Sequence, residues 1–146
     1  MRLGILNEGY GFGTKLLFSL IRLFSRQPVP DAARLTFYRP DFYGSLSKAL
    51  THEAMRGPSA WSVAERELMA AYVSKVNDCP FCIGAHTATA TQAAGNEVLV
   101  AAALADLESA PVEERLRATL RMLGRLTRDG CLSAGDVRAV LDTGVS

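Results

Sequence analysis

The stretch ELMAAYVSKVNDCPFCIGAH, residues 67–86, decides the fold because it reads as two helices joined by a short turn. Before the turn, apolar residues recur at helical spacing and form a core stripe: Leu68, Met69, Tyr72, Val73 and Val76. Asn77-Asp78 predicts the turn itself. A second, alanine-rich helix follows, with Cys79 as its N-cap, Pro80 at its first position and Gly95 at its end.

The rest of the chain also shows helical signals and no segment with strand periodicity. The pairs Ser62/Glu65 and Ser133/Asp136 have the spacing of capping boxes and predict two helix starts. We expect an irregular, glycine-rich arm first and then further helices over these ranges: 14–26, 40–56, 97–107 and 111–129. The predicted fold class is therefore all-α.

Cys79, Cys82 and His86 place two thiols and an imidazole at the start of the second helix of this hairpin. One helical turn separates the cysteines, so their Cα atoms should lie about 5 to 6 Å apart, within reach of a disulfide. Free N–H groups and the helix dipole stabilise a thiolate at this end. His86 lies one turn beyond Cys82 on the same face and can relay a proton to or from it.

Glu67 is the fourth candidate and lies on the first helix of the hairpin. At about 1.5 Å per residue, Glu67 and His86 lie about 15 and 9 Å from the turn, or about one turn out of level. A water bridge or a tilted crossing of the two helices would close that gap. The carboxylate would then orient and charge the histidine.

Two of the predicted helices carry a polar row opposite an apolar face. In the helix over 14–26 the row is Lys15, Ser19, Arg22 and Arg26. This helix is either a basic membrane anchor or a packing or dimerisation helix, and we favour the second interpretation. In the helix over 111–129 the row is Arg117, Arg121, Arg125 and Arg128. It is either an anion-binding stripe or a solvated or intersubunit face, and again we favour the second.

The composition bounds the size of the fold and its partners. The chain has 146 residues, 49% of them hydrophobic, and a formal net charge of +1. We predict a single domain over 1–146, with an arm and amphipathic helix over 1–39 and a core over 40–146. The balanced charge favours neither nucleic acid nor a membrane as a partner. The high apolar fraction favours a homo-oligomer.

The three cysteines are an odd number at irregular spacing, which does not fit a secreted disulfide scaffold and favours a reducing cytoplasm. The apolar segment from Leu16 to Phe24 is interrupted by Ser19 and Arg22, so it predicts neither a signal peptide nor a membrane span. Cys131 is expected to be a small buried apolar residue. His52, near a predicted helix end, is expected to be a surface or capping residue.

Three other kinds of site use similar residues. A zinc site on the two thiols and His86 needs His52 or Glu67 as its fourth ligand, and the spacing offers no second pair. Covalent haem attachment requires a histidine directly after the second cysteine, where Ile83 stands. A thioredoxin-like fold requires a βαβ pattern that the sequence lacks. We therefore expect no metal and no cofactor.

Glu67, Cys79, Cys82 and His86, separated by eleven, two and three residues, resemble the signature of the AhpD-like alkylhydroperoxidase branch of the carboxymuconolactone decarboxylase superfamily. Other segments are similar to that family as well: Glu65 to Leu68, Val73-Ser74, Asn77 and Leu126 to Gly130. The likeness covers residues 40–146. Four positions at fixed spacing are much more specific than CxxC alone.

The resemblance implies an all-helical fold, usually assembled as trimers or hexamers, and a peroxidase cycle. For the homo-oligomer expected here, a dimer is the third option. Cys82 would attack the hydroperoxide and become a sulfenic acid, and Cys79 would resolve it to a disulfide. Glu67 and His86 would form the proton relay. A dithiol partner, such as a lipoyl-bearing or thioredoxin-like protein, would reduce the disulfide.

The sequence departs from this family in two places. Pro80-Phe81 stands between the cysteines where the best-known member has a polar pair with histidine, which removes a proton-transfer group. The chain also ends at Ser146, where relatives typically start a further helix. Two alternatives remain open: a lactone decarboxylase of the same superfamily, and a redox-responsive stress or binding protein without turnover. Enzyme and sensor use the same thiol chemistry, so the residues do not separate them.

Overall fold

The computed structural model describes residues 4–145, and every regular element in this range is an α-helix. The all-α prediction is confirmed. The chain divides into two compact units, Met1–Ala54 and Met55–Ser146. The assignment of one domain to residues 1–146 stays a prediction. Within the described range, none of the helices combines the length and the apolar character needed to cross a bilayer.

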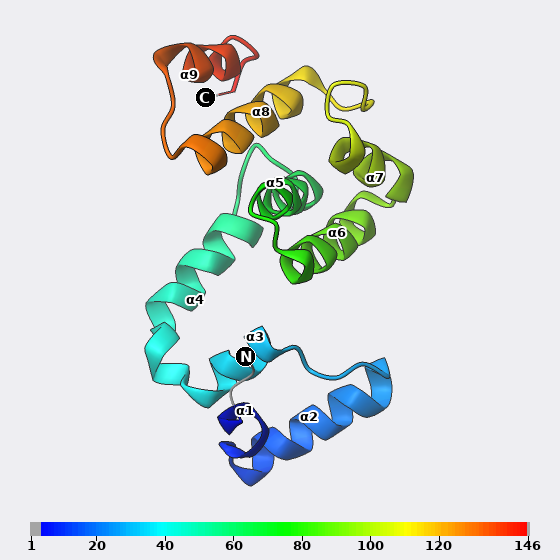
Figure 1. The fold of residues 1–146 in the computed structure, drawn as a ribbon, viewed down its shortest axis with the longest axis vertical. Coiled ribbons are helices and arrows are strands. Elements are labelled where there is room, and N and C mark those ends of the chain that lie inside the picture. Colours follow the sequence, from blue (N-terminus) through cyan, green and yellow to red (C-terminus); the bar gives the residue numbers. More distant parts are fainter. Residues whose placement is uncertain (1–3, 146) are drawn as a thin grey trace. The chain divides into compact units, whose positions relative to one another are not determined.

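The first unit contains α1 (Ile5–Glu8), α2 (Phe12–Ser25), α3 (Asp31–Tyr38) and most of α4 (Pro40–Arg56) (Figure 1). Aromatic rings pack edge to face between α2, α3 and the segment before α2. The ring of Phe18 lies 5.1 Å from that of Tyr10 and 5.3 Å from that of Phe37, measured between centroids. Such pairs contribute stabilisation beyond that of simple burial.

The helix boundaries of this unit differ from the predicted ones. Residues 5–8, expected to be irregular, form α1, and α2 begins at Phe12 and ends where Arg26 adopts a left-handed φ of 55°. The two prolines after α2 predicted only a helix end. Pro30 is also the N-cap of α3, a helix that the sequence pattern did not predict. The predicted helix over 40–56 is present as α4, but Gly44 breaks its helical geometry with a φ of 63°.

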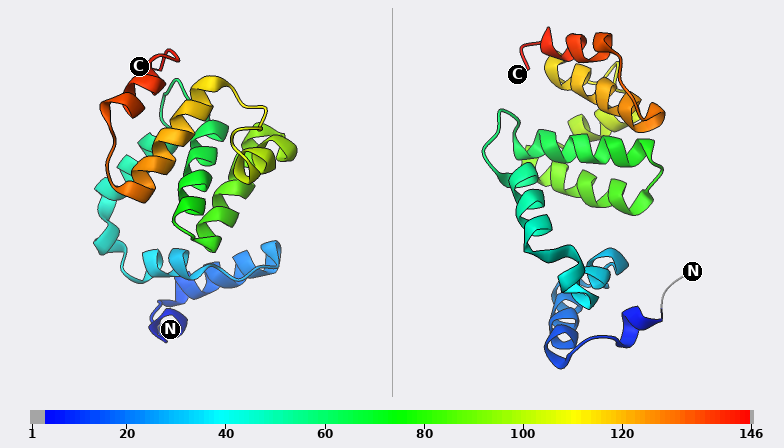
Figure 2. Two further views of the ribbon diagram at one scale, coloured as in Figure 1. Left: turned by 45° about the horizontal axis from the view of Figure 1, so that its top comes forward. Right: turned by 90° about the vertical axis from the view of Figure 1, so that its left-hand side faces the viewer.

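The second unit is built on two antiparallel helices, α5 (Val63–Val76) and α6 (Pro80–Ala94), which lie side by side (Figures 1 and 2). It also contains α7 (Glu97–Ala105), α8 (Glu114–Asp129) and α9 (Ala134–Leu141). α8 packs on α5, and α9 packs on α8. The core holds buried residues from four of these helices: Leu68, Ala90, Val100, Ala103, Leu116 and Leu120.

The helix ends of this unit follow the local signals in the sequence. The Ser62 hydroxyl accepts a hydrogen bond from the Glu65 N–H at 3.2 Å, and the Glu65 carboxylate accepts one from the Ser62 N–H at 2.7 Å. Ser133 and Asp136 form the same capping box before α9. Gly95 ends α6 with a left-handed φ of 63°. These predictions are confirmed.

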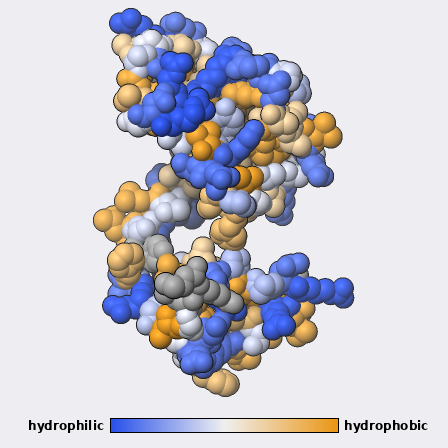
Figure 3. Space-filling model, viewed as in Figure 1, coloured by the Kyte–Doolittle hydropathy of each residue, from blue (hydrophilic) through white to orange (hydrophobic). Residues whose placement is uncertain are grey.

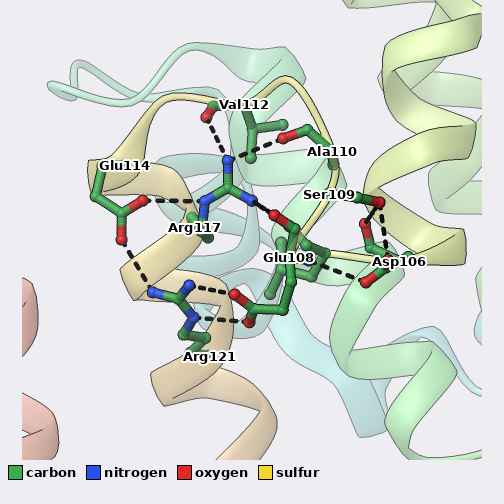
Figure 4. Close-up of polar contacts among 9 residues, drawn as sticks. Asp106, Glu108, Ser109, Ala110, Val112, Glu114, Arg117 and Arg121 are labelled. Atoms are coloured by element: carbon green, nitrogen blue, oxygen red, sulfur yellow. Dashed lines mark hydrogen bonds and ion pairs between the residues drawn. The ribbon is translucent and has the colours of Figure 1, made fainter.

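Arg117 organises the connection between α7 and α8 (Figure 4). Its guanidinium donates to backbone carbonyl oxygens of that connection, including those of Glu108 at 2.7 Å and Ala110 at 2.9 Å. It also donates to the carbonyls of Leu107 and Val112. The side chain is only 14% exposed. The expectation that this arginine belongs to a solvated or intersubunit face was therefore wrong, because its donors hold the loop.

Two further expectations for this unit need correction. Pro111 lies in the connection that Arg117 binds, and α8 begins only at Glu114, with Glu113 as its N-cap. Cys131 is exposed rather than buried. Gly130 ends α8 immediately before it with a φ of 69°, so the thiol lies in the connection to α9 and not on a core-facing helix.

Figure 3 shows many hydrophilic side chains, mixed with apolar ones, at the end of the second unit that holds α8 and α9. Arg121 and Arg125 belong to α8, with side chains 45% and 55% exposed. For these two members of the arginine row, the solvated interpretation agrees with the structure. The row thus divides into a buried structural residue and exposed ones.

Candidate functional site

Cys79 and Cys82 lie at the turn end of the α5–α6 hairpin and are joined by a disulfide. Their Cα atoms are 5.4 Å apart, within the predicted range. The turn passes through Asp78, whose φ of 50° is in the left-handed region that aspartate tolerates. The Cys79 N–H donates to the Ser74 carbonyl at 3.0 Å and closes the turn.

The sequence correctly predicted how the cysteine pair is placed on its helix. Cys79 is the N-cap of α6 and Pro80 is the first helical residue. Both cysteines are half-buried, whereas Phe81 between them is 51% exposed. The positive end of the α6 dipole stabilises negative charge on a sulfur at this position. The site is therefore suited to a thiolate when the disulfide is reduced.

Glu67 and His86 contact each other directly across the hairpin. Glu67 Oε2 lies 2.7 Å from His86 Nδ1, so a bridging water is not needed. The sequence predicted that the two residues lie about one turn out of level. That estimate counted only the rise of the Cα atoms along the helices, and the two side chains are long enough to close the gap. Glu67 is 3% exposed, and the His86 side chain is 36% exposed.

Arg56 is a member of the site that the sequence pattern did not reveal. Its Nη2 lies 2.5 Å from Glu67 Oε1, the carboxylate oxygen that His86 leaves free. Its Nη1 donates to the carbonyl of Met55 at 2.8 Å, which ties the guanidinium to the end of α4. Helical periodicity pairs residues within one helix, and Arg56 reaches Glu67 from a different helix, so spacing carried no signal for it.

Burial of the Glu67 carboxyl by itself raises its pKa, because it disfavours the charged form. Hydrogen bonds from His86 and Arg56 oppose this effect and hold the pKa of Glu67 below its ordinary value. An ionised carboxylate only accepts hydrogen bonds, so the Nδ1–H of His86 donates to it. Nε2 of the neutral ring is then the acceptor. The arrangement gives His86 a fixed tautomer with one basic nitrogen.

The four predicted residues therefore lie together on one hairpin. The other candidate zinc ligand, His52, is on a different unit. It is an exposed residue of α4 within the first unit. In the part of the chain that the structure describes, no three side chains of the metal-ligating kinds, His, Cys, Asp and Glu, are gathered into a candidate metal site.

A polar hollow of about 340 Å³ beside α8 tests the anion-binding interpretation of the arginine row. Three arginines line it, and three carboxylates oppose them: Arg121, Arg125, Arg128, Glu108, Glu114 and Asp136. Arg121 pairs with Glu108 and Glu114, and Arg125 pairs with Asp136. Because these charges balance, the hollow offers no excess positive charge to an anion.

The hairpin and its four-residue motif agree with a known family. The model of the Carboxymuconolactone decarboxylase family matches residues 40–125 of the 146. The chain belongs to this family. No curated protein matches the sequence.

Two solved structures are similar in fold. The first, an uncharacterized peroxidase-related protein from Silicibacter sp. TM1040, has a TM-score of 0.78 and 23% identity, and the match covers 99% of this chain and 75% of that one. The second, the alkylhydroperoxidase AhpD core of an uncharacterized peroxidase-related protein from Ralstonia eutropha JMP134, has a TM-score of 0.74 and 18% identity, over 100% and 76% of the two chains. Together with the family match they confirm the AhpD-like fold.

Proposed function

We propose that the protein is a thiol-dependent peroxidase that reduces hydroperoxides at Cys82. One observation carries the proposal: Cys82 is paired with Cys79 at a helix start, and His86, one turn further, is bound through Nδ1 to the buried Glu67 carboxylate at 2.7 Å. Membership of the Carboxymuconolactone decarboxylase family and the peroxidase-related names of the structural neighbours support it.

The first step oxidises Cys82. Its thiolate attacks the terminal oxygen of the hydroperoxide, the O–O bond breaks, and the sulfur becomes a sulfenic acid. The leaving alkoxide takes up a proton and departs as an alcohol. His86 accepts the thiol proton at Nε2 and returns it to the alkoxide, while Glu67 stabilises the imidazolium that forms in between.

The second and third steps restore the dithiol. The Cys79 thiolate attacks the Cys82 sulfur, the S–S bond forms and the sulfenic oxygen leaves as water after protonation. A dithiol of a lipoyl-bearing or thioredoxin-like protein then reduces the disulfide by exchange and becomes a disulfide itself. Two electrons pass from the external dithiol to the hydroperoxide in each cycle.

We further propose that the protein works in the cytoplasm as a homo-oligomer. A cycle that needs an external dithiol fits a reducing compartment. Large apolar side chains stay exposed on the second unit, which supports a further contact surface: Phe81, Val98, Leu126, Val137 and Leu141. Mass measurement in solution tests the oligomeric part of the proposal.

Steady-state turnover with alkyl hydroperoxides and a panel of dithiol reductants tests the peroxidase proposal. We expect Cys82→Ser to abolish hydroperoxide consumption, and Cys79→Ser to accumulate a sulfenic acid or a mixed disulfide at Cys82, detected by mass spectrometry. Cys131→Ser is the matched control, because this thiol is exposed and lies outside the hairpin. It should keep the parent rate.

Retention of the parent rate by Cys82→Ser would overturn the peroxidatic assignment. Failure of the parent protein with every peroxide and dithiol pair would instead favour a redox-responsive protein without turnover. Conversion of a lactone substrate by the Cys82→Ser variant would favour the decarboxylase alternative.

A further inference from the structure

Arg56 and His86 share one buried carboxylate, and each takes a different oxygen of it. Arg56 Nη2 lies 2.5 Å from Glu67 Oε1, and His86 Nδ1 lies 2.7 Å from Oε2. The Glu67 side chain is 4% exposed, so water has little access to replace either partner. The carboxylate is therefore held from both sides.

The end of α4 holds Arg56 in place for this contact. The guanidinium donates to the Met55 carbonyl. Gly57, the residue after Arg56, is buried. Arg66, next to Glu67 on α5, donates to the Gly57 carbonyl at 2.9 Å. These bonds tie the end of α4 to the start of α5, so Arg56 reaches Glu67 from a position that the backbone supports.

The permanent positive charge of Arg56 affects which of Glu67 and His86 carries the proton of the hydrogen bond between them. With histidine as its only partner, a buried carboxyl can keep its own proton and donate a hydrogen bond to Nδ1 of the neutral imidazole. A guanidinium at hydrogen-bond distance favours the ionised carboxylate, which then accepts the proton-bearing Nδ1. The ring must leave Nε2 unprotonated.

We propose that Arg56 is a positioning residue of the thiol site, which acts through Glu67 to fix the tautomer of His86 with Nε2 as the basic nitrogen. The inference rests on the proposed function, because the position of the proton on the His86 ring matters only if His86 relays protons to Cys82. It does not require hydroperoxide as the substrate. Arg56 itself touches neither sulfur in this scheme, so its effect must pass through the carboxylate.

Imidazole ¹⁵N shifts test the tautomer directly, at a pH that keeps the ring neutral. The chain has two histidines, and a His52→Gln background leaves only the His86 signal. We expect the Nδ1–H form in the parent and in Arg56→Lys, which keeps the charge. In Arg56→Met we expect a substantial Nε2–H population. An unchanged Nδ1–H form in Arg56→Met would overturn the proposal.

Alkylation of reduced Cys82 by iodoacetamide, located by mass spectrometry, tests the consequence for the thiol. We expect Arg56→Met to slow the reaction about tenfold, the scale typical of partners that orient a site histidine. Arg56→Lys should recover most of the rate. In a Glu67→Gln background, Arg56→Met should have no further effect, since Arg56 acts through that carboxylate. An equal effect in both backgrounds would contradict this.

Arg115→Met is the matched control for loss of an arginine that pairs with a carboxylate of α5. Arg115 lies on α8, its side chain is 33% exposed against 38% for Arg56, and it pairs at 2.8 Å with Glu65 of α5, the helix that carries Glu67. It should change neither the tautomer nor the alkylation rate. Arg56→Gln replaces Arg56→Met in every measurement if the methionine variant does not fold. Neither readout uses peroxide, so a parent protein that consumes none would refute the peroxidase proposal and leave this inference standing.

Discussion

The second unit contains two buried polar networks, and each includes an arginine and a glutamate. In the hairpin network, a buried Glu67 carboxylate receives donors from Arg56 and His86. In the loop network, the largely buried Arg117 guanidinium donates to carbonyl oxygens between α7 and α8 (Figure 4). One network is centred on an anion and the other on a cation.

The difference between the two networks lies in the chemical type of their members. Every donor of Arg117 faces a backbone carbonyl or the Glu114 carboxylate, so this network consists of hydrogen bonds that hold a loop. The hairpin network includes His86, an imidazole with one nitrogen that can donate and one that can accept, and His86 lies one helical turn beyond Cys82 on α6. The comparison therefore sets the network that we propose as a proton relay against one that holds a loop.

The largest expected effect comes from breaking the hairpin network at its centre. Glu67→Gln removes the charge that orients His86 and stabilises its imidazolium. We expect the rate of Cys82 oxidation by an alkyl hydroperoxide to fall about 100-fold, the lower range for loss of proton-transfer catalysis. Single-turnover kinetics of the reduced protein measure this step without the reductant.

The same variant also gives a stability readout with a defined sign. Because the folded-state pKa of Glu67 is lowered, its contribution to stability is present above the unfolded value and is lost as pH falls through the folded one. Wild type should therefore lose more stability than Glu67→Gln as pH drops below the ordinary value of 4.5. Parallel acid profiles and an unchanged oxidation rate would contradict the role given to this carboxylate.

The loop network should respond in the opposite way. Arg117→Met leaves several carbonyls of the α7–α8 connection without their donor, and we expect it to lower the free energy of unfolding by about 2 to 4 kcal/mol. The rate of Cys82 oxidation in the folded fraction should stay at the parent level. Urea unfolding followed by circular dichroism, with single-turnover kinetics on the same samples, checks both parts. A selective loss of the oxidation rate at full stability would remove the distinction between the networks.

Much of the hairpin could be predicted because its signals are local. The Ser62/Glu65 capping box, the proline at the first position of α6 and Gly95 act within one helical turn of the ends they set. The sequence pattern did not predict α3. Pro28 and Pro30 indicated the end of the preceding helix, and Pro30 is also the N-cap of α3. Local signals thus predicted most helix ends of the hairpin, but they did not show whether a proline ends one helix or begins the next.

The site residues also differ in whether local sequence signals could predict their contacts. The spacing of Cys82 and His86 follows from one helix and could be read from the sequence, and the contact between His86 and Glu67 needed the packing of two. Arg56 depends on where the connection after α4 places a different helix, and no periodicity reports that. Arg117 shows the same limit, because a row of arginines on one helix face does not reveal that one of them is covered by a loop.

The smallest expected effect tests the boundary of the loop network. Arg121 lies one turn beyond Arg117 and pairs with Glu108 and Glu114, but its side chain is 45% exposed and theirs are 61% exposed. Because exposed pairs gain little over hydration, Arg121→Gln should lower the free energy of unfolding by less than about 1 kcal/mol, and added salt should shrink the difference further. Urea unfolding at low and high ionic strength measures it. A loss as large as that of Arg117→Met would mean that the exposed carboxylates, rather than the buried carbonyl contacts, hold the α7–α8 connection.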